Sequence, residues 1–240
     1  MVDIMATLYG AVLNFRPAEP TWEGRDRFIL SKGHGVLGFF PALVEAGIMT
    51  EETFNTFKKS ESDLIAHPVM NLPLGIESSN GSLGQGLSMA VGLALAAGRK
   101  KATHRIYALL GDGECNEGMI WEAAMCAAHY RLSQLTAIID YNRFQSDGEI
   151  TKVLNTEMLS EKWRSFGWDV IDVDGHDVSQ LLGAFARETV ENRPKAIFAR
   201  TVKGKGIRFM ENNNEWHHNR LTKATYDQAV GELGGVVCSS

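Results

Sequence analysis

The sequence predicts an α/β protein in which a doubly wound, mostly parallel β-sheet has helices on both faces. Short β-rich runs alternate along the chain with longer segments of helical periodicity, which is the order expected of a parallel sheet. The β-rich runs are nearly continuously apolar in their middle, as strands buried on both faces are. With 240 residues, of which 44% are hydrophobic, the chain is long enough to bury a sizeable core. We expect one domain over residues 1–233 and a disordered small-residue tail over 234–240.

The individual elements follow from local patterns. The expected strands are 105–110, 135–140, 169–173 and 195–200, and the expected helices are 2–15, 39–46, 50–58, 83–97, 117–130, 156–166 and 178–191. Between the first two strands, Met119, Ala123 and Ala127 recur at helical spacing, which completes a βαβ unit. Thr50 is an N-cap candidate. Segments 61–86 and 203–220 are polar and irregular, and long loops inside a compact domain are commonly functional.

Composition and charge argue against several classes of protein. The net charge is -5, the sequence pI is about 5.8, and the basic residues are spread along the chain, so no basic face for nucleic acid is expected. Cys115, Cys126 and Cys238 are odd in number and form no C-x-x-C pair, which favours a reducing cytoplasm over a disulfide framework or a zinc site. The apolar stretch 83–97 is shorter than the ~20 residues of a membrane span. Residues 1–14 lack the basic segment of a signal peptide.

Polar residues follow two neighbouring strands of the predicted sheet. Gly111-Asp112-Gly113 comes directly after the strand 105–110, and Asp140-Tyr141-Asn142 ends the next one. Because the carboxyl ends of parallel strands share one edge of a sheet, where ligands bind, we expect Asp112 and Asn142 to converge. Two hard oxygen ligands suit Mg²⁺, which completes its coordination with water and substrate phosphates, so a diphosphate is implied. Gly113 would let the backbone approach that diphosphate closely.

Taken alone, these residues leave two other interpretations open. Asp112-Gly113 would also fit an ordinary tight turn, with Asn142 capping the segment that follows it. A nicotinamide-type fingerprint fits less well, because the third glycine of G-x-G-x-x-G falls on Asn116.

Several further motifs accompany this pair of strand ends. In chain order they are Arg25-Asp26-Arg27-Phe28-Ile29-Leu30-Ser31-Lys32-Gly33-His34-Gly35, His67-Pro68, Gly81-Ser82-Leu83-Gly84-Gln85-Gly86, Gly111-Asp112-Gly113-Glu114-Cys115-Asn116-Glu117-Gly118, Asp174-Gly175-His176-Asp177, Lys203-Gly204-Lys205-Gly206 and Glu215-Trp216-His217. Gly111-Asp112-Gly113 with Asn142 resembles the thiamine diphosphate motif, and the ordered set resembles the transketolase family over nearly the whole chain. The resemblance implies the diphosphate-binding domain of the thiamine diphosphate-binding fold. It also implies thiamine diphosphate and Mg²⁺ as cofactors, and transfer of a two-carbon ketol unit from a ketose phosphate to an aldose.

The same resemblance implies roles for individual residues. Asp112, Asn142 and the main-chain carbonyl of Phe144 would hold Mg²⁺, while Gly113 and Asn142 would touch the diphosphate. The implied catalytic residues are His34 and His217, which match histidines near the diphosphate or the reacting sugar, and His67, which matches a contact to donor-sugar oxygens. The other implied cofactor contacts are Gly81, Ser82 and Leu83 against the thiamine rings, Lys32 and Lys203 near phosphates, and Glu117, which also helps to link paired cofactor sites. Without the resemblance, segment 81–86 would read as a flexible loop and the Lys203 stretch as a solvated turn.

Thiamine diphosphate needs a carboxylate on its aminopyrimidine ring, because no side chain otherwise activates its C2 carbon. In the family this glutamate lies in a second domain, for which no segment of the sequence remains. We therefore expect the N-terminal subunit of a split transketolase that acts on sugar phosphates together with a separate C-terminal subunit. Paired cofactor sites in the family imply a dimer of heterodimers.

Three departures from the family pattern keep other functions open. The usual upstream Gly-His-Pro segment has no counterpart, Ser146 stands where the family commonly has an aliphatic residue against the thiazolium, and residues 234–240 match nothing. Another thiamine diphosphate enzyme, such as a deoxyxylulose phosphate synthase or a 2-oxo acid dehydrogenase component, would share Asp112 and Asn142. A non-catalytic regulatory or truncated subunit is the remaining alternative.

Overall fold

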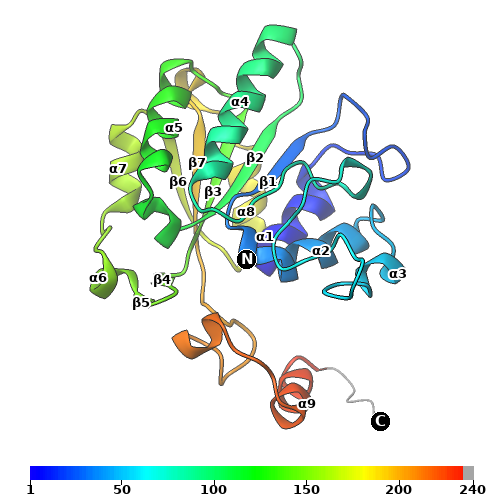
Figure 1. The fold of residues 1–240 in the computed structure, drawn as a ribbon. Coiled ribbons are helices and arrows are strands. Elements are labelled where there is room, and N and C mark those ends of the chain that lie inside the picture. The colour runs from blue at the N-terminus through cyan, green and yellow to red at the C-terminus, as the bar shows by residue number, and fades with distance from the viewer. Residues whose placement is uncertain (235–240) are drawn as a thin grey trace.

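The computed structural model describes residues 1–234, which contain a five-stranded parallel sheet between two layers of helices (Figure 1). The strands are β1 (Arg27–Leu30), β2 (Ile106–Gly111), β3 (Leu135–Tyr141), β6 (Asp169–Asp174) and β7 (Lys195–Arg200). They lie in the order β1-β2-β3-β7-β6, and every neighbouring pair is parallel. This topology confirms the predicted fold class.

Each face of the sheet has its own helical layer and its own hydrophobic cluster. Helices α4 (Gln85–Lys100), α5 (Gly118–His129) and α7 (Leu159–Ser165) cover one face, and α1 (Val2–Thr7), α2 (Val36–Glu45) and α8 (Val178–Ala186) cover the other (Figure 1). Within β2, Leu110 belongs to the cluster under α4 and α5, and Leu109 belongs to the cluster under α1, α2 and α8. Because side chains alternate between two covered faces, the central strand β2 is buried at every position, whereas the edge strand β6 is buried only at Val170 and Val173.

Smaller elements lie outside the sandwich. They are the helices α3 (Glu51–Phe54), α6 (Ile150–Val153) and α9 (Lys223–Glu232) and the antiparallel hairpin of β4 (Phe144–Gln145) and β5 (Gly148–Glu149). The sequence pattern did not predict α6, α9 or the hairpin, because each is too short or too polar to show a clear period. Residues 235–240, on which most of the expected disordered tail falls, lie outside the described residues.

The structure corrects several element boundaries. Strand β1 was not predicted, because only three of its residues follow the charged Arg25-Asp26-Arg27 run, and its pairing with β2 defines it. Helix α8 ends at Ala186, well before 191, where the Lys195 ammonium donates to the carbonyls of Ala184 and Phe185 at 2.9 and 3.0 Å. The expected helix 2–15 is α1 followed by a π-helical turn, Leu8–Val12, and α7 starts only at Leu159. The expected helix 50–58 shortens to α3.

The Thr50 N-cap is confirmed: its hydroxyl accepts a hydrogen bond from the Thr53 N–H at 3.1 Å. Among residues 1–234, no helix combines the length and apolarity that crossing a membrane requires.

Candidate functional site

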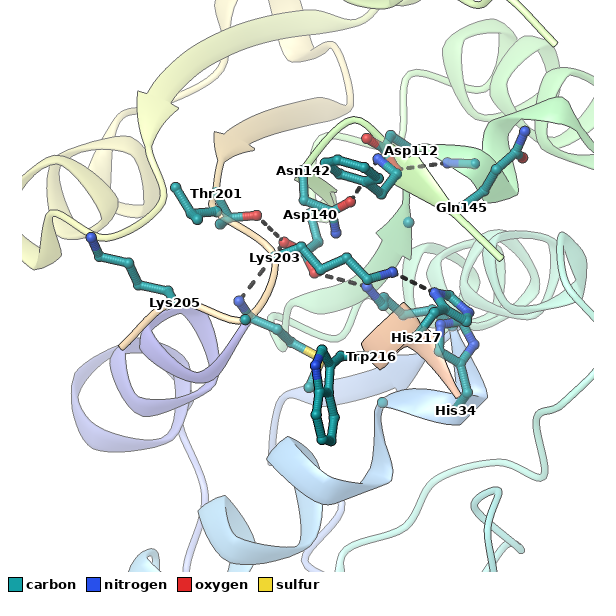
Figure 2. A pocket seen from close by; sticks show the side chains of 18 of the residues that line it. His34, Asp112, Asp140, Asn142, Gln145, Thr201, Lys203, Lys205, Trp216 and His217 are labelled. Atoms are coloured by element: carbon teal, nitrogen blue, oxygen red, sulfur yellow. Dashed lines mark hydrogen bonds and ion pairs between the residues drawn. The ribbon is translucent and has the colours of Figure 1, made fainter. Parts of the chain in front are cut away.

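A cavity of about 480 Å³ opens at the edge of the sheet where the parallel strands end (Figure 2). Each of four strands contributes lining residues just beyond its carboxyl end: Lys32 after β1, Asp112 after β2, Asn142 after β3 and Lys203 after β7. The segment before α4 adds Leu83, and the chain beyond β7 returns with Trp216 and His217. The cavity therefore lies at the edge predicted for ligand binding.

Asp112 is one of the buried acids that line this cavity. Its Oδ1 accepts the Gly113 N–H at 2.8 Å, and its Oδ2 accepts the Arg143 N–H at 2.5 Å. Burial raises the pKa of Asp112 to about 6, against the opposing effect of these two N–H donors. A buried carboxylate of this kind is stabilised by a nearby cation, and within the described chain the hydrogen-bond partners of Asp112 are both uncharged backbone groups.

The oxygen donors around Asp112 suit a hard cation. The contact between Asp112 and the Arg143 N–H brings the residues after β2 and β3 together, as the strand-end argument predicted. The Asn142 side-chain oxygen accepts the Phe144 N–H at 2.9 Å, which folds residues 142–144 into a tight turn at the cavity wall. No group of three or more His, Cys, Asp or Glu side chains that could hold a metal occurs among residues 1–234. A metal held here would thus use one carboxylate with amide and carbonyl oxygens, a set typical of Mg²⁺ and not of zinc.

A buried ion pair lies at the base of the cavity. Lys32 Nζ donates to Asp140 Oδ2 at 2.8 Å, and the Thr201 hydroxyl donates to Asp140 Oδ1 at 2.5 Å. Burial alone would lower the pKa of Lys32, but the Asp140 carboxylate reverses this effect and holds it above its usual value. Burial likewise opposes ionisation of Asp140, but Lys32 holds the pKa of that carboxyl well below its usual range. Lys32 is therefore a fixed cation in the cavity.

A third buried carboxylate, Glu114, joins two of the predicted ligand-binding segments. It accepts the Ser31 hydroxyl at 2.5 Å, the Gly84 N–H at 2.9 Å and the Gly111 N–H at 3.0 Å. The loop before α4 is thereby tied to the Gly111-Asp112-Gly113 turn.

His34, Lys203 and His217 meet on the opposite side of the cavity from Asp112 (Figure 2). Lys203 Nζ lies 2.6 Å from His217 Nδ1, and the rings of His34 and His217 are 5.5 Å apart. Burial, with the charge of Lys32, lowers the pKa of Lys203 to about 8. Burial and the neighbouring cations lower the pKa of His34 to about 4 and also lower that of His217. At neutral pH both imidazoles are uncharged, and a protonated Lys203 leaves the Nε2–H of His217 as the hydrogen-bond donor.

The structure brings most of the predicted site residues into one cavity, but not all of them. Those that line it are Lys32, His34, Leu83, Asp112, Gly113, Asn142, Phe144, Lys203 and His217. His67 is exposed beside Gly81, and neither residue lines the cavity. Ser82 is exposed as well, and Glu117 lies on the surface beside Gly84 at the start of α5. Their predicted roles stay predictions.

Sequence reasoning missed three residues that organise the cavity: Glu114, Asp140 and Thr201. The signal for two of them was present, because Asp140 is an acidic residue in the last part of β3 and Glu114 follows the end of β2 by three residues. Thr201 carries no such signal, since its role depends on the pairing of β3 with β7.

The chain matches a family model described as transketolase, thiamine diphosphate binding domain, over residues 1–235. It is 38% identical over 233 residues to an apulose-4-phosphate transketolase subunit of Phocaeicola vulgatus, covering 97% of this chain and 83% of that protein. It is 40% identical over 232 residues to a 6-deoxy-6-sulfo-D-fructose transketolase subunit of a Clostridium species, covering 96% and 84%. Human transketolase is 37% identical over 232 residues, which cover 96% of this chain and 37% of the human protein.

Solved transketolase structures have the same fold as this chain. The transketolase of Campylobacter jejuni superposes with a TM-score of 0.88 at 28% identity, over 97% of this chain and 38% of that one. The transketolase of Leishmania mexicana superposes with a TM-score of 0.85 at 28% identity, over 97% and 36%. This chain thus spans less than two fifths of those transketolases. By its sequence, its fold and the residues that line its cavity, the chain belongs to the transketolase family, of which it carries the thiamine diphosphate-binding domain.

Proposed function

We propose that this chain is the catalytic N-terminal subunit of a transketolase that moves a two-carbon ketol unit from a ketose phosphate to an aldose, with thiamine diphosphate and Mg²⁺. The observation that carries the proposal is the arrangement of one cavity. Oxygen donors at Asp112 and Asn142 lie across it from the basic side chains of His34, Lys203 and His217. A diphosphate bridged to a cation needs both kinds of partner.

On this proposal, Asp112, Asn142 and the Phe144 carbonyl hold Mg²⁺, and Gly113 with Asn142 contacts the diphosphate. A Cβ on Gly113 would lie 2.7 Å from the Cβ of Gln145, so the turn has no room for a side chain. Leu83 lines the cavity and would pack against the thiamine rings, with Gly81 and Ser82 in the exposed loop before it. When bound, the thiazolium ring supplies an acceptor for the electron pair of the broken carbon–carbon bond.

The chain's own basic groups would handle charge and protons. Lys32, fixed by Asp140, and Lys203 would meet phosphate oxygens. The neutral His34 and the Nε2–H of His217 would donate to, or exchange protons with, hydroxyl oxygens of the donor sugar. His67, exposed beside Gly81, would reach the sugar from outside the present cavity wall.

The names of the relatives support a partner and a class of substrate. Two of them are transketolase subunits, so we infer a separate C-terminal subunit here that supplies the pyrimidine-binding glutamate. One name specifies a sugar phosphate and the other a sulfo sugar, which favours a donor with an anionic end. Glu117, exposed at the start of α5, would link paired sites in a dimer of heterodimers. We place this assembly in the cytoplasm.

The metal assignment is tested with Asp112→Ala. Mg²⁺-dependent binding of thiamine diphosphate, measured by calorimetry on the full chain together with its C-terminal subunit, should disappear, because the only carboxylate among the three proposed ligands is lost. The control is His104→Asn, which lies before β2 at the opposite edge of the sheet. Undiminished affinity in the Asp112 variant would contradict the metal site.

Release of CO₂ during turnover would identify a decarboxylating thiamine enzyme instead of a transketolase.

A further inference from the structure

The Asp174-Gly175-His176-Asp177 motif at the end of β6 has no part in the chemistry described above, yet it packs against the end of β7. The Gly175 N–H donates to the Arg200 carbonyl at 2.8 Å. A Cβ on Gly175 would lie 2.5 Å from the Thr201 Cγ2 atom, so only glycine permits this approach. The turn after β6 thus packs closely against the segment that leads to Lys203.

The two aspartates of the motif hold the turn itself. Asp174 Oδ1 accepts the His176 N–H at 2.8 Å. Asp177 Oδ1 accepts the N–H groups of Ser179 and Gln180 at 2.9 and 3.1 Å, which makes Asp177 the N-cap of α8. The His176 N–H is therefore held by Asp174, and the residue that follows His176 caps α8.

The His176 ring joins three separate parts of the chain. Its Nδ1 lies 2.7 Å from Asp3 Oδ2 on α1, and its Nε2 lies 2.8 Å from the Val202 backbone nitrogen. A backbone N–H can only donate, so Nε2 must be the unprotonated acceptor and Nδ1 carries the proton that Asp3 accepts. Asp3, His176 and Val202 all line the cavity, and the His176 side chain is only 18% exposed.

We propose that His176, oriented by Asp3, is a positioning residue that holds the Val202 backbone and so sets where the Lys203 ammonium group sits in the cavity. Lys203 follows Val202 directly, and its Nζ ends beside His217 Nδ1 (Figure 2). This inference rests on the proposed function, in which the Lys203 charge meets phosphate oxygens. His176 itself touches no reacting atom.

Two amide substitutions separate the contacts of His176. In His176→Gln the side-chain oxygen reaches the place of Nε2 and can still accept the Val202 N–H. In His176→Asn the amide reaches only as far as Nδ1, so it can meet Asp3 but not Val202. His104→Asn repeats the same chemical change at the opposite edge of the sheet and serves as the control.

Three measurements on the full chain test the proposal. Long-range ¹H–¹⁵N NMR of the wild type should show His176 protonated at Nδ1 and not at Nε2. Hydrogen exchange at the Val202 amide should be slow in the wild type, His104→Asn and His176→Gln, and faster in His176→Asn. With the C-terminal subunit present, the affinity for thiamine diphosphate and Mg²⁺ should fall roughly threefold to tenfold in His176→Asn, as for one lost hydrogen bond, and recover in His176→Gln.

An Nε2-protonated ring, or equal Val202 exchange in the two His176 variants, would overturn the proposal. Equal affinity for thiamine diphosphate in these two variants, despite different exchange rates of the Val202 amide, would also overturn it. The hydrogen bond from Val202 to His176 would then have no effect on ligand binding. If no variant binds thiamine diphosphate, the wild type included, the proposed function fails. The NMR and exchange results still decide in that case whether His176 holds Val202.

Discussion

Glu114 and Asp140 are buried carboxylates with different partners. Asp140 pairs with the Lys32 ammonium and the Thr201 hydroxyl, so its charge is compensated by a full opposite charge. Glu114 is instead held by one hydroxyl and two backbone N–H groups, which are dipoles. Burial accordingly raises the pKa of Glu114 against the effect of these donors, whereas Lys32 holds the pKa of Asp140 low.

We expect Glu114→Gln to destabilise the fold by roughly 2–4 kcal/mol, because one amide oxygen cannot accept three hydrogen bonds and the new NH₂ group faces donors. Glu122→Gln, on the exposed face of α5, makes the same chemical change and should leave stability within about 0.5 kcal/mol of the wild type. Urea denaturation of both variants measures the difference. Equal midpoints would show that Glu114 is not a structural acceptor.

The lowered pKa of Lys203 predicts that binding of thiamine diphosphate and Mg²⁺ depends on pH. This pKa, lowered to about 8 by burial and by Lys32, means that the ammonium is charged below pH 8 and loses its charge as the pH rises through that value. Affinity for thiamine diphosphate and Mg²⁺ should therefore fall from pH 7 to pH 9, by roughly tenfold if one charge-assisted hydrogen bond is lost. In Lys203→Met the affinity should be low and nearly flat over this range. A wild-type profile as flat as that of the variant would speak against a phosphate contact at Lys203.

At the scale of elements, the start of α4 lies unusually close to the end of β1. A Cβ on Gly86 would lie 2.5 Å from the Cβ of Ser31 and 2.6 Å from its Cα, so backbone and side chain both block it. Ser31 in turn donates to Glu114, which also holds the Gly84 N–H. The close packing of α4 on β1 thus sets the position of the 81–84 loop relative to the cavity.

Two glycines of α4 give opposite expectations for alanine. Gly86→Ala should destabilise the protein by about 1–3 kcal/mol through overpacking and should also weaken thiamine diphosphate binding. Gly92→Ala, where no atom lies within 4 Å of the added Cβ, should stabilise it by roughly 0.5–1 kcal/mol through helix propensity. Thermal unfolding of the two variants is the measurement. If Gly86→Ala were as stable as the wild type and bound thiamine diphosphate equally well, α4 would be able to move away from β1 without affecting stability or the cavity.

At the level of the whole molecule, the cavity lies at one edge of a single sheet, where residues from four strand ends meet. The basic side chains after β1 and β7 approach the acidic strand ends of β2 and β3 only because β1 and β7 flank that central pair. Beyond β7, the chain folds back through Trp216 and His217 to form the remaining wall.

The assembly proposed above has a direct consequence for activity. The purified chain alone should not transfer ketol units, because the pyrimidine-binding glutamate is proposed to come from the C-terminal subunit, and the mixture of both subunits should do so. A coupled assay with a ketose phosphate donor and an aldose phosphate acceptor compares the two samples at equal chain concentration. Ordinary enzymatic turnover by the chain alone would contradict the split arrangement.

Local sequence patterns are enough to predict the main strands and helices and the position of the cavity. Runs rich in apolar and β-branched residues predict β2, β3, β6 and β7 within one residue of their ends. The convergence of Asp112 with the residues after β3 followed from the parallel arrangement alone. Strand β1 and helix α6 could not be predicted, because four-residue elements carry too little periodicity and depend on their neighbours.

Periodicity and the order of the elements are enough to predict the fold class, the ligand-binding edge and the residue types that meet there. The contacts that hold those residues follow from tertiary packing. The Glu114, Asp140 and His176 contacts join positions far apart in the chain, such as Ser31 with Glu114 and Asp3 with His176. Such contacts arise when separate strands and helices pack, and burial then sets the pKa values of Asp112 and Lys203, which no local pattern encodes.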